Sequence, residues 1–140
     1  MKVSDVMTAQ VVTAKPTTTV QQLAKTMSEI DSGAVPILED GKVVGLVTDR
    51  DIVVRVIATG GDLWTPASDI MSGEVQTCRE EDKLADATAK MASQQVRRLV
   101  VLNEDGRLCG IVSLGDIALD YGDKVVGHTL EEISAAPATH

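Results

Sequence analysis

The sequence predicts an α+β fold made of two β-α-β-β-α repeats that pack sheet against sheet about a pseudo-twofold axis. The chain repeats itself, since GLVTDRDI at 45–52 has an echo, GIVSLGDI, at 110–117. Each copy alternates stretches of helical periodicity with short apolar runs. A copy of about 50–60 residues can bury little core alone, so we expect the two copies to pack together.

The duplication stays in register over most of the chain. SDVM at 4–7 matches SDIM at 68–71, and AVPIL at 34–38 lies over RLVVL at 98–102, both at an offset of 64. Beyond the following Asp-Gly the offset is 65, so the second copy has one extra residue in its turn. Surface turns tolerate such insertions. The pattern predicts repeat 1 over 1–58, a linker over 59–66, repeat 2 over 67–121 and a tail over 122–140.

Each copy can be divided into elements. Apolar residues at helical spacing predict a helix over 19–31, and the apolar run 34–38 predicts a buried strand. Asp40-Gly41 predicts a hairpin turn into a second strand. The full set is a strand near 11–13, a helix over 19–31, strands over 34–38 and 42–47 and a helix over 49–58, then a strand at 75–77, a helix over 83–94, strands over 99–102 and 108–112 and a helix from 114.

Composition limits the partners. The chain has 21 acidic and 13 basic residues, giving a formal charge of −8. An acidic surface repels phosphate backbones, which predicts that the protein does not bind nucleic acid. The longest apolar runs are too short to span a membrane, and the N-terminus MKVSDVMTAQ lacks an apolar signal core. We therefore expect a cytoplasmic protein with no membrane partner.

The predicted helix over 49–58 lacks a polar face. Its apolar residues wrap most of its circumference, whereas a surface helix keeps one side polar. The simplest account is a second burial against another copy, which predicts a homodimer. The apolar residues are Ile52, Val53, Val54, Val56 and Ile57.

No motif nominates catalysis or a metal site. Cys78 and Cys109 have no C-x-x-C partner, so we interpret them as small buried residues, with a disulfide or metal pair as the alternative. His128 and His140 are single. The chain has no P-loop, no G-x-G-x-x-G and no nucleophile elbow. We expect a non-enzyme without a cofactor.

The duplicated pattern SD[VI]M…DG…G-[LI]-V-[TS]-x-x-D-I resembles the cystathionine β-synthase (CBS) domain, here as a tandem pair, or Bateman module. The resemblance covers nearly the whole chain and leaves no catalytic domain, as in stand-alone regulatory or stress-linked members. It implies an adenosine-containing ligand such as AMP, ADP or ATP in the cleft between the repeats. It also implies an effector protein that the sequence does not name.

The resemblance also implies where the ligand lies. Adenine contacts the first strand and the short apolar strand of one copy, and the [ST]-x-x-D of the other copy holds the ribose. A carboxylate suits this role because its two acceptor oxygens match two adjacent hydroxyls. Site one would combine Thr13, Ala34, Val35 and Pro36 with Ser113 and Asp116, and site two would combine Thr77, Arg98, Leu99 and Val100 with Thr48 and Asp51.

Three arginines are candidate phosphate ligands. Arg97 and Arg98 form the strongest basic pair, and Arg50 precedes Asp51. Their forked donors suit phosphate, with a solvated strand edge or an ion pair as the alternative. Because Leu114-Gly115 replaces Asp49-Arg50, the two sites are unequal, and we expect site two to bind phosphate more tightly.

Other interpretations remain open. Thr48-x-x-Asp51 and Ser113-x-x-Asp116 also match helix capping boxes, in which the acid bonds the cap N–H instead of a ligand. Both roles could hold in turn. One alternative function is a stress-linked structural or interaction protein without a nucleotide. Another is a redox or metal protein that uses Cys78 and Cys109.

Overall fold

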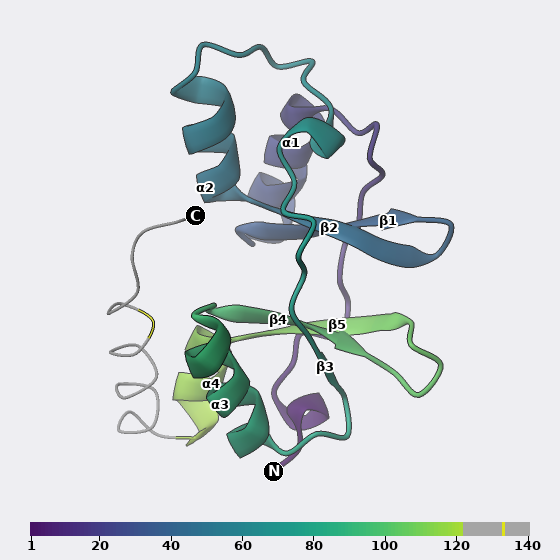
Figure 1. The fold of residues 1–140 in the computed structure, drawn as a ribbon, viewed down its shortest axis with the longest axis vertical. Coiled ribbons are helices and arrows are strands. Elements are labelled where there is room, and N and C mark those ends of the chain that lie inside the picture. Colours follow the sequence, from purple (N-terminus) through teal and green to yellow (C-terminus); the bar gives the residue numbers. More distant parts are fainter. Residues whose placement is uncertain (122–132, 134–140) are drawn as a thin grey trace. The chain divides into compact units, whose positions relative to one another are not determined.

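The computed structural model describes residues 1–121 and Ile133. These residues form two compact units (Figure 1). Unit A is Val11–Val75, and unit B joins Met1–Gln10 to the chain from Gln76 onward. Helices and two separate sheets confirm the predicted α+β class. The predicted tail, with His128 and His140, lies outside the described residues except for Ile133.

Unit A is a β-hairpin with helices on one face (Figure 1). The first helix begins where the Thr19 hydroxyl accepts the N–H of Gln22 at 3.3 Å, and it ends at Asp31, whose φ of 51° is left-handed. The two strands are antiparallel. The elements are α1 (Val20–Ile30), β1 (Ala34–Glu39), β2 (Lys42–Thr48), α2 (Asp49–Ile52), the π-helix η2 (Val53–Ile57) and the 3-10 turn η3 (Ala67–Asp69).

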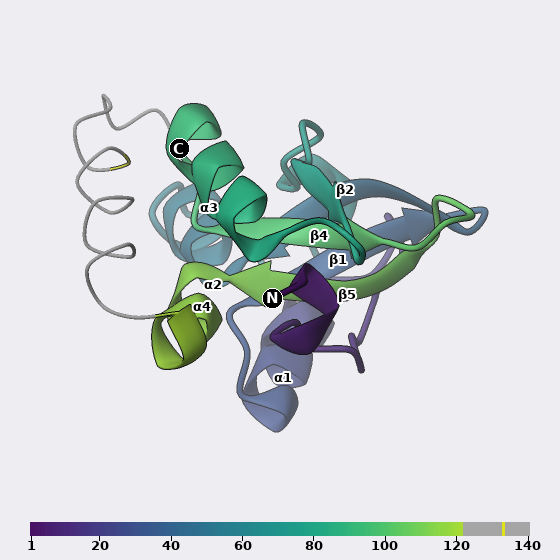
Figure 2. The same ribbon diagram turned by 90° about the horizontal axis from the view of Figure 1, so that it is seen from below.

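Unit B repeats this plan with one more strand. In its sheet β3 runs parallel to β4, and β4 runs antiparallel to β5. The N-terminal 3-10 turn η1 belongs to this unit (Figure 2). The elements are η1 (Val3–Asp5), β3 (Thr77–Arg79), α3 (Leu84–Gln94), β4 (Arg98–Leu102), β5 (Leu108–Ser113) and α4 (Leu114–Tyr121).

The two hairpin turns locate the one extra residue of repeat 2. In unit A, Asp40 and Gly41 both have positive φ, at 52° and 78°, as a two-residue hairpin turn requires. In unit B the turn is longer, and only Gly106 takes positive φ there, at 77°. The Asn103 side chain closes this turn by accepting the N–H groups of Asp105 at 2.9 Å and Arg107 at 3.0 Å. The insertion therefore lies in the turn, as predicted.

The strand predicted near 11–13 was wrong, because the chain forms no strand over these described residues. An isolated parallel bridge joins Ala14 to Ile37 instead. The reason lies in β1, where Pro36 has no N–H to donate. Its counterpart Val100 donates to the Gln76 carbonyl at 3.1 Å and so extends the ladder in unit B. The predicted helix over 49–58 is also divided, since η2 continues α2 as a π-helix.

The first residues of each repeat pack in the unit built by the other repeat. We call residues 1–10 and 67–75 the crossing segments. Val3 donates its N–H to the Asp82 carbonyl at 2.9 Å in unit B, and Ala67 donates to the Thr18 carbonyl at 2.8 Å in unit A. Both bonds join equivalent positions of the duplicated sequence. The structural units and the sequence repeats therefore have different boundaries.

A reciprocal pair of bonds fixes the far end of each crossing segment. In unit A, Leu46 and Ser72 exchange N–H···O=C bonds of 3.1 and 3.0 Å. In unit B, Ile111 and Thr8 exchange bonds of 3.0 and 2.8 Å. These four bonds, which join each crossing segment to the hairpin of the opposite repeat, use backbone groups only.

Two repeated glycines make room for two repeated methionines. A Cβ at Gly45 would meet the Met71 side chain, and a Cβ at Gly110 would lie 2.6 Å from the Met7 sulfur. At both glycines the Cβ would lie closer to the methionine than real Cβ atoms lie to their neighbours. Glycine is required in β2 and β5 because the crossing methionine lies directly against the strand.

Each unit buries its own apolar core, which includes side chains from a crossing segment. Val3 enters the core of unit B, and Ala67 and Ile70 enter that of unit A. Each repeat thus completes the core of the other. The core of unit A is Val20, Leu23, Met27, Val35, Ile37, Val47, Ile52, Val56, Ala67 and Ile70; that of unit B is Val3, Cys78, Leu84, Ala87, Met91, Leu99, Val101, Val112, Leu114, Ile117 and Ile133.

We predict that Gly45→Ala lowers the free energy of unfolding by about 1–3 kcal/mol, because the new methyl group overlaps Met71. Urea denaturation measures this change. Gly73→Ala is the matched control, since a Cβ at Gly73 meets nothing within 4 Å. In a Met71→Ala background Gly45→Ala should cost little more. Equal stability of Gly45→Ala and the unmodified protein would refute the contact.

Candidate functional site

In unit A the predicted site residues gather at one edge of the sheet. Ala34, at the start of β1, is paired with Thr48 at the end of β2. Ala14 lies along β1, donating its N–H to the Pro36 carbonyl at 3.0 Å. The start of α2 follows Thr48 directly. We call this group, residues 13, 34–36 and 48–51, the first site edge.

Unit B has the equivalent edge. Thr77 is paired with Val100, and Arg98 is paired with Ser113 at the end of β5. Residues 77, 97–100 and 113–116 form the second site edge. One backbone bond closes both edges in the same way: Asp49 donates to the Gly33 carbonyl, and Leu114 donates to the Arg97 carbonyl, each at 2.9 Å.

Both [ST]-x-x-D motifs form capping boxes, as their spacing predicts. Thr48 donates its N–H to Asp51 Oδ2 at 2.8 Å, and Asp51 donates its N–H to Thr48 Oγ1 at 3.1 Å. Ser113 and Asp116 make the same two bonds at 3.3 and 3.1 Å. Each cap uses only one carboxylate oxygen. The second oxygen of Asp116 has no hydrogen bond to any described residue, so capping leaves acceptor capacity for a ligand.

The strand side chains alternate between two faces. Val35 and Leu99 point into the cores of their units, so only their backbone groups can contact a ligand. Ala34, Pro36 and Val100 lie on the opposite faces of their strands. The Ala34 N–H and C=O both lie 3.4 Å from the Ser32 hydroxyl, which is long for a hydrogen bond. Ala34 thus offers a weakly bonded donor and acceptor side by side.

The charges around Asp51 differ from expectation. Its ion partner is Arg55, with Nε 3.8 Å from Asp51 Oδ1, rather than Arg50. Lys2 with Glu81 is the other ion pair in the part of the chain that the structure describes. Arg50, Arg97 and Arg98 therefore have no carboxylate within salt-bridge distance among these residues. Arg55 was not among the predicted site residues, although an acid followed four residues later by Arg is a recognised helical pair.

The predicted pairing of residues into two sites stays a prediction. Each predicted site takes residues from both units. Within one unit, the structure places Ala34 beside Thr48 and Arg98 beside Ser113, residues that the prediction assigned to different sites. The short apolar strand and the [ST]-x-x-D motif are therefore neighbours within each edge.

Comparison with known proteins decides the family. The model of the CBS domain matches twice, at residues 3–58 and 67–122. This chain belongs to the CBS-domain family. It is 41% identical to the CBS domain-containing protein YhcV of Bacillus subtilis over 94% of both chains. The tandem CBS pair predicted from the sequence is thereby confirmed.

Two solved structures show related CBS proteins with bound groups. The CBS domain protein PAE2072 of Pyrobaculum aerophilum, complexed with AMP, has a TM-score of 0.78 and 25% identity, covering 97% of this chain and 100% of that one. Hypoxic Response Protein I, with two coordinated zinc ions, has a TM-score of 0.75 and 34% identity, covering 86% and 98%. Similar chains therefore hold either a nucleotide or metal ions.

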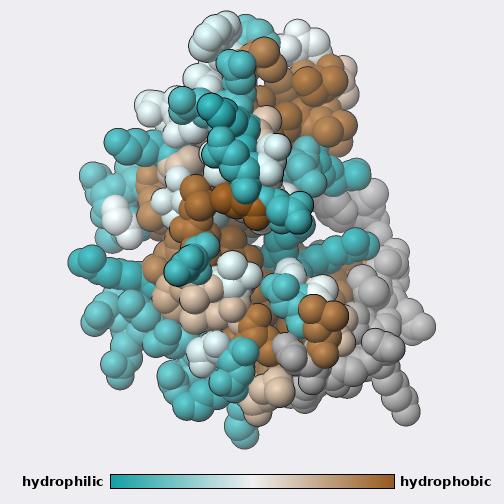
Figure 3. Space-filling view, turned by 180° about the vertical axis from the view of Figure 1, so that it is seen from behind, coloured by the Kyte–Doolittle hydropathy of each residue, from teal (hydrophilic) through white to brown (hydrophobic). Residues whose placement is uncertain are grey.

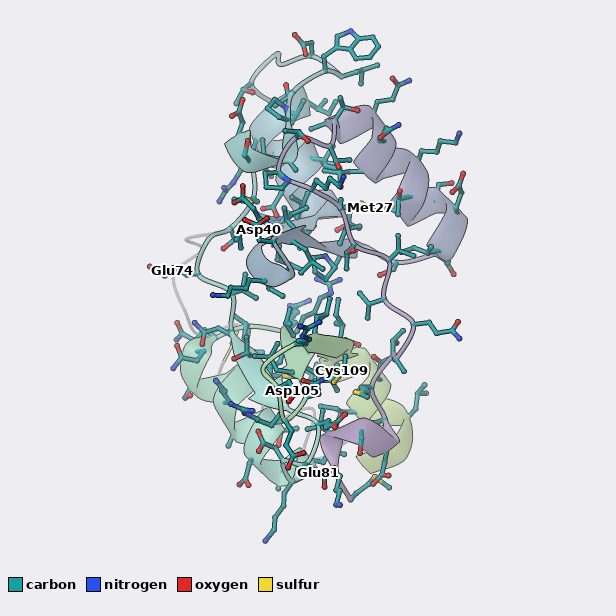
Figure 4. All side chains as sticks on the ribbon, turned by 90° about the vertical axis from the view of Figure 1, so that its right-hand side faces the viewer. Met27, Asp40, Glu74, Glu81, Asp105 and Cys109 are labelled. Carbon is teal, nitrogen blue, oxygen red and sulfur yellow. The ribbon has the colours of Figure 1, made fainter. Side chains whose placement is uncertain are left out.

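The cysteines of this CBS pair occupy structural positions. Cys78 and Cys109 match Ala14 and Val44, the apolar residues at the same places in repeat 1. Strand β4 separates them, so their Cα atoms are about 9–10 Å apart, beyond the roughly 7 Å reach of a disulfide. Both are free thiols, and Cys109 lies among the strands of unit B (Figure 4).

Burial raises the pKa of each thiol to about 11. The nearby Asp82 adds to this for Cys78. Glu80 adds to it for Cys109, whose thiol donates to the Glu80 carboxylate at 3.4 Å. Both groups are protonated at neutral pH, and a protonated thiol is a poor nucleophile and metal ligand. These properties oppose the redox alternative.

Within residues 1–121 and Ile133, no three His, Cys, Asp or Glu side chains gather as a metal site would need. The helices of the same residues include none with the length and apolar character to cross a bilayer.

We predict slow alkylation of both cysteines. A pKa of about 11 in place of 9 lowers the thiolate fraction at pH 8 by about 100-fold, so iodoacetamide should react at least that much more slowly with the folded protein than with the urea-unfolded chain. The reaction rate should rise until the pH approaches 11. Cys109→Ser assigns the remaining rate to Cys78. Rapid labelling of folded protein at pH 7 would contradict the structural role.

Proposed function

We propose that this CBS pair is a regulatory ligand-sensing module that binds adenosine nucleotides at its two site edges. The observation that carries the proposal is the position of each capped carboxylate. Asp51 and Asp116 keep acceptor capacity beyond the cap, and each lies at the end of a hairpin whose other strand offers backbone groups at the same edge.

The chemistry of adenosine fits these groups. The carboxylates would accept the two ribose hydroxyls. The Ala34 N–H and C=O, weakly bonded to Ser32, match the adjacent acceptor and donor on the edge of adenine. Pro36 and Val100 would give the ring an apolar surface. Arg50, Arg97 and Arg98, which have no ion partner among the described residues, would bind phosphate.

The family supports the same class of ligand. A similar CBS protein holds AMP, and no known catalytic arrangement is needed for such a module. We therefore propose a binding protein rather than an enzyme, acting on an effector protein through a change between two states that the ligand contacts differently.

The test is isothermal titration calorimetry with AMP, ATP and S-adenosylmethionine. Asp51→Asn and Asp116→Asn keep an acceptor for the cap but lose the charge, and we expect at least one of them to weaken binding about 10- to 100-fold, the value of hydrogen bonds to a charged group. Asp105→Asn, in the exposed turn of unit B, is the charge-matched control. Unchanged affinity in both variants would end the ribose assignment.

Absence of any binding heat would support the alternative, an interaction protein in which the boxes serve only as caps. The completeness of both boxes is the observation that favours it.

We further propose that η2 is a homodimer contact. Ile52 and Val56 are buried in unit A, but Val53, Val54 and Ile57 are 57%, 41% and 60% exposed. Figure 3 shows hydrophobic residues gathered at the upper right, the side on which α2 lies when Figure 1 is turned by 180°. Exposed apolar patches of this kind mark protein interfaces.

Sedimentation velocity tests this contact. We expect a dimer for the unmodified protein and a monomer for Ile57→Glu, because a charge would be buried in the interface. Leu119→Glu is the matched control, at the 86% exposed residue of α4. A dimer that persists in Ile57→Glu, or a monomeric unmodified protein, would refute the proposal.

A further inference from the structure

Arg55 connects the first site edge to a segment of the other repeat. Its guanidinium Nη1 donates to the Ile70 carbonyl at 3.1 Å, and its Nε lies 3.8 Å from Asp51 Oδ1. The Asp51 side chain is 16% exposed and that of Arg55 is 44% exposed. One side chain thus contacts both the carboxylate of the site and the backbone of a crossing segment.

Ile70 anchors the crossing segment 67–75 within unit A. Its side chain is 3% exposed and packs in the core of that unit. The next residue, Met71, lies against Gly45, and Ser72 exchanges backbone bonds with Leu46. A shift of the Ile70 carbonyl would therefore disturb the seating of the whole segment.

The arrangement is specific to repeat 1. The residue that matches Arg55 is Asp120, four positions after Asp116. An acid cannot form the ion pair with a carboxylate that an arginine forms at this spacing. The chemistry that links carboxylate to crossing segment is therefore encoded in unit A alone.

We propose that Arg55 is a positioning residue that orients Asp51 and couples its occupancy to the seating of residues 67–75. This rests on the proposed function, because Asp51 is taken as the ribose ligand. A hydroxyl bound to Asp51 fixes the carboxylate, which fixes the guanidinium and so holds the Ile70 carbonyl. Since the crossing segment continues into β3, ligand binding at repeat 1 stabilises the start of repeat 2. The coupling acts equally in both directions.

Amide hydrogen exchange, measured without a ligand, tests whether Arg55 holds the crossing segment 67–75 in place. Arg55→Gln should speed exchange of the Ala67–Ser72 amides by about fivefold or more, because the shorter and uncharged glutamine amide cannot replace the charged donor to the Ile70 carbonyl. The equivalent residues 3–8 serve as an internal control and should not change. Circular dichroism checks that the variant folds. Equal exchange in the two proteins would overturn the proposal.

Binding experiments test the coupling to the site. AMP should slow exchange at residues 67–72 in the unmodified protein but not in Arg55→Gln. The variant should also bind adenosine and AMP more weakly by the same factor, about fivefold, because Arg55 acts through the ribose ligand. In an Asp51→Asn background, Arg55→Gln should not weaken the binding of adenosine or AMP any further.

The remaining outcomes are decisive in other ways. If Arg55→Gln weakened the binding of AMP but not that of adenosine, Arg55 would contact phosphate. This result would overturn the positioning role. If the unmodified protein binds no adenosine compound, the proposed function and the ligand coupling fail together. The exchange measurement without ligand still decides whether Arg55 holds the crossing segment.

Discussion

The contact between a methionine of each crossing segment and a glycine of the opposite hairpin is the constraint on which both units depend. Met71 lies against Gly45 and Met7 against Gly110, and backbone bonds fix each segment beside them. A Cβ at either glycine would overlap the methionine side chain. Each unit therefore needs the first residues of the other repeat, which gives the duplication a physical reason: one repeat alone lacks part of its own core.

Local features were predictable because neighbouring residues determine them. The Asp40-Gly41 turn, the offset change at the second turn and the helix over 20–30 follow from backbone preferences and periodicity. The crossing segments were not predictable in this way. SDVM and SDIM were recognised as a repeat, but no periodicity states which hairpin they pair with. The sequence shows that Pro36 lacks an N–H and cannot donate to a neighbouring strand. The resulting loss of the strand near 11–13 was not predicted.

The candidate site was predictable to a similar extent. The capping boxes follow from the residue types at 48–51 and 113–116, because the interacting groups are three residues apart. Arg55 carried a visible signal, its spacing from Asp51, but its bond to the Ile70 carbonyl depends on the crossing segment. Which strand supplies the base contacts for which carboxylate depends on long-range packing, so the pairing of the edges remains a prediction.

Nuclear Overhauser contacts from methyl-labelled methionines test the exchange of segments most directly. The account predicts contacts from the Met71 methyl group to the α protons of Gly45, and from the Met7 methyl group to those of Gly110. Contacts from Met7 to Gly45 and from Met71 to Gly110 would show that each segment packs on its own repeat, and they would contradict the account.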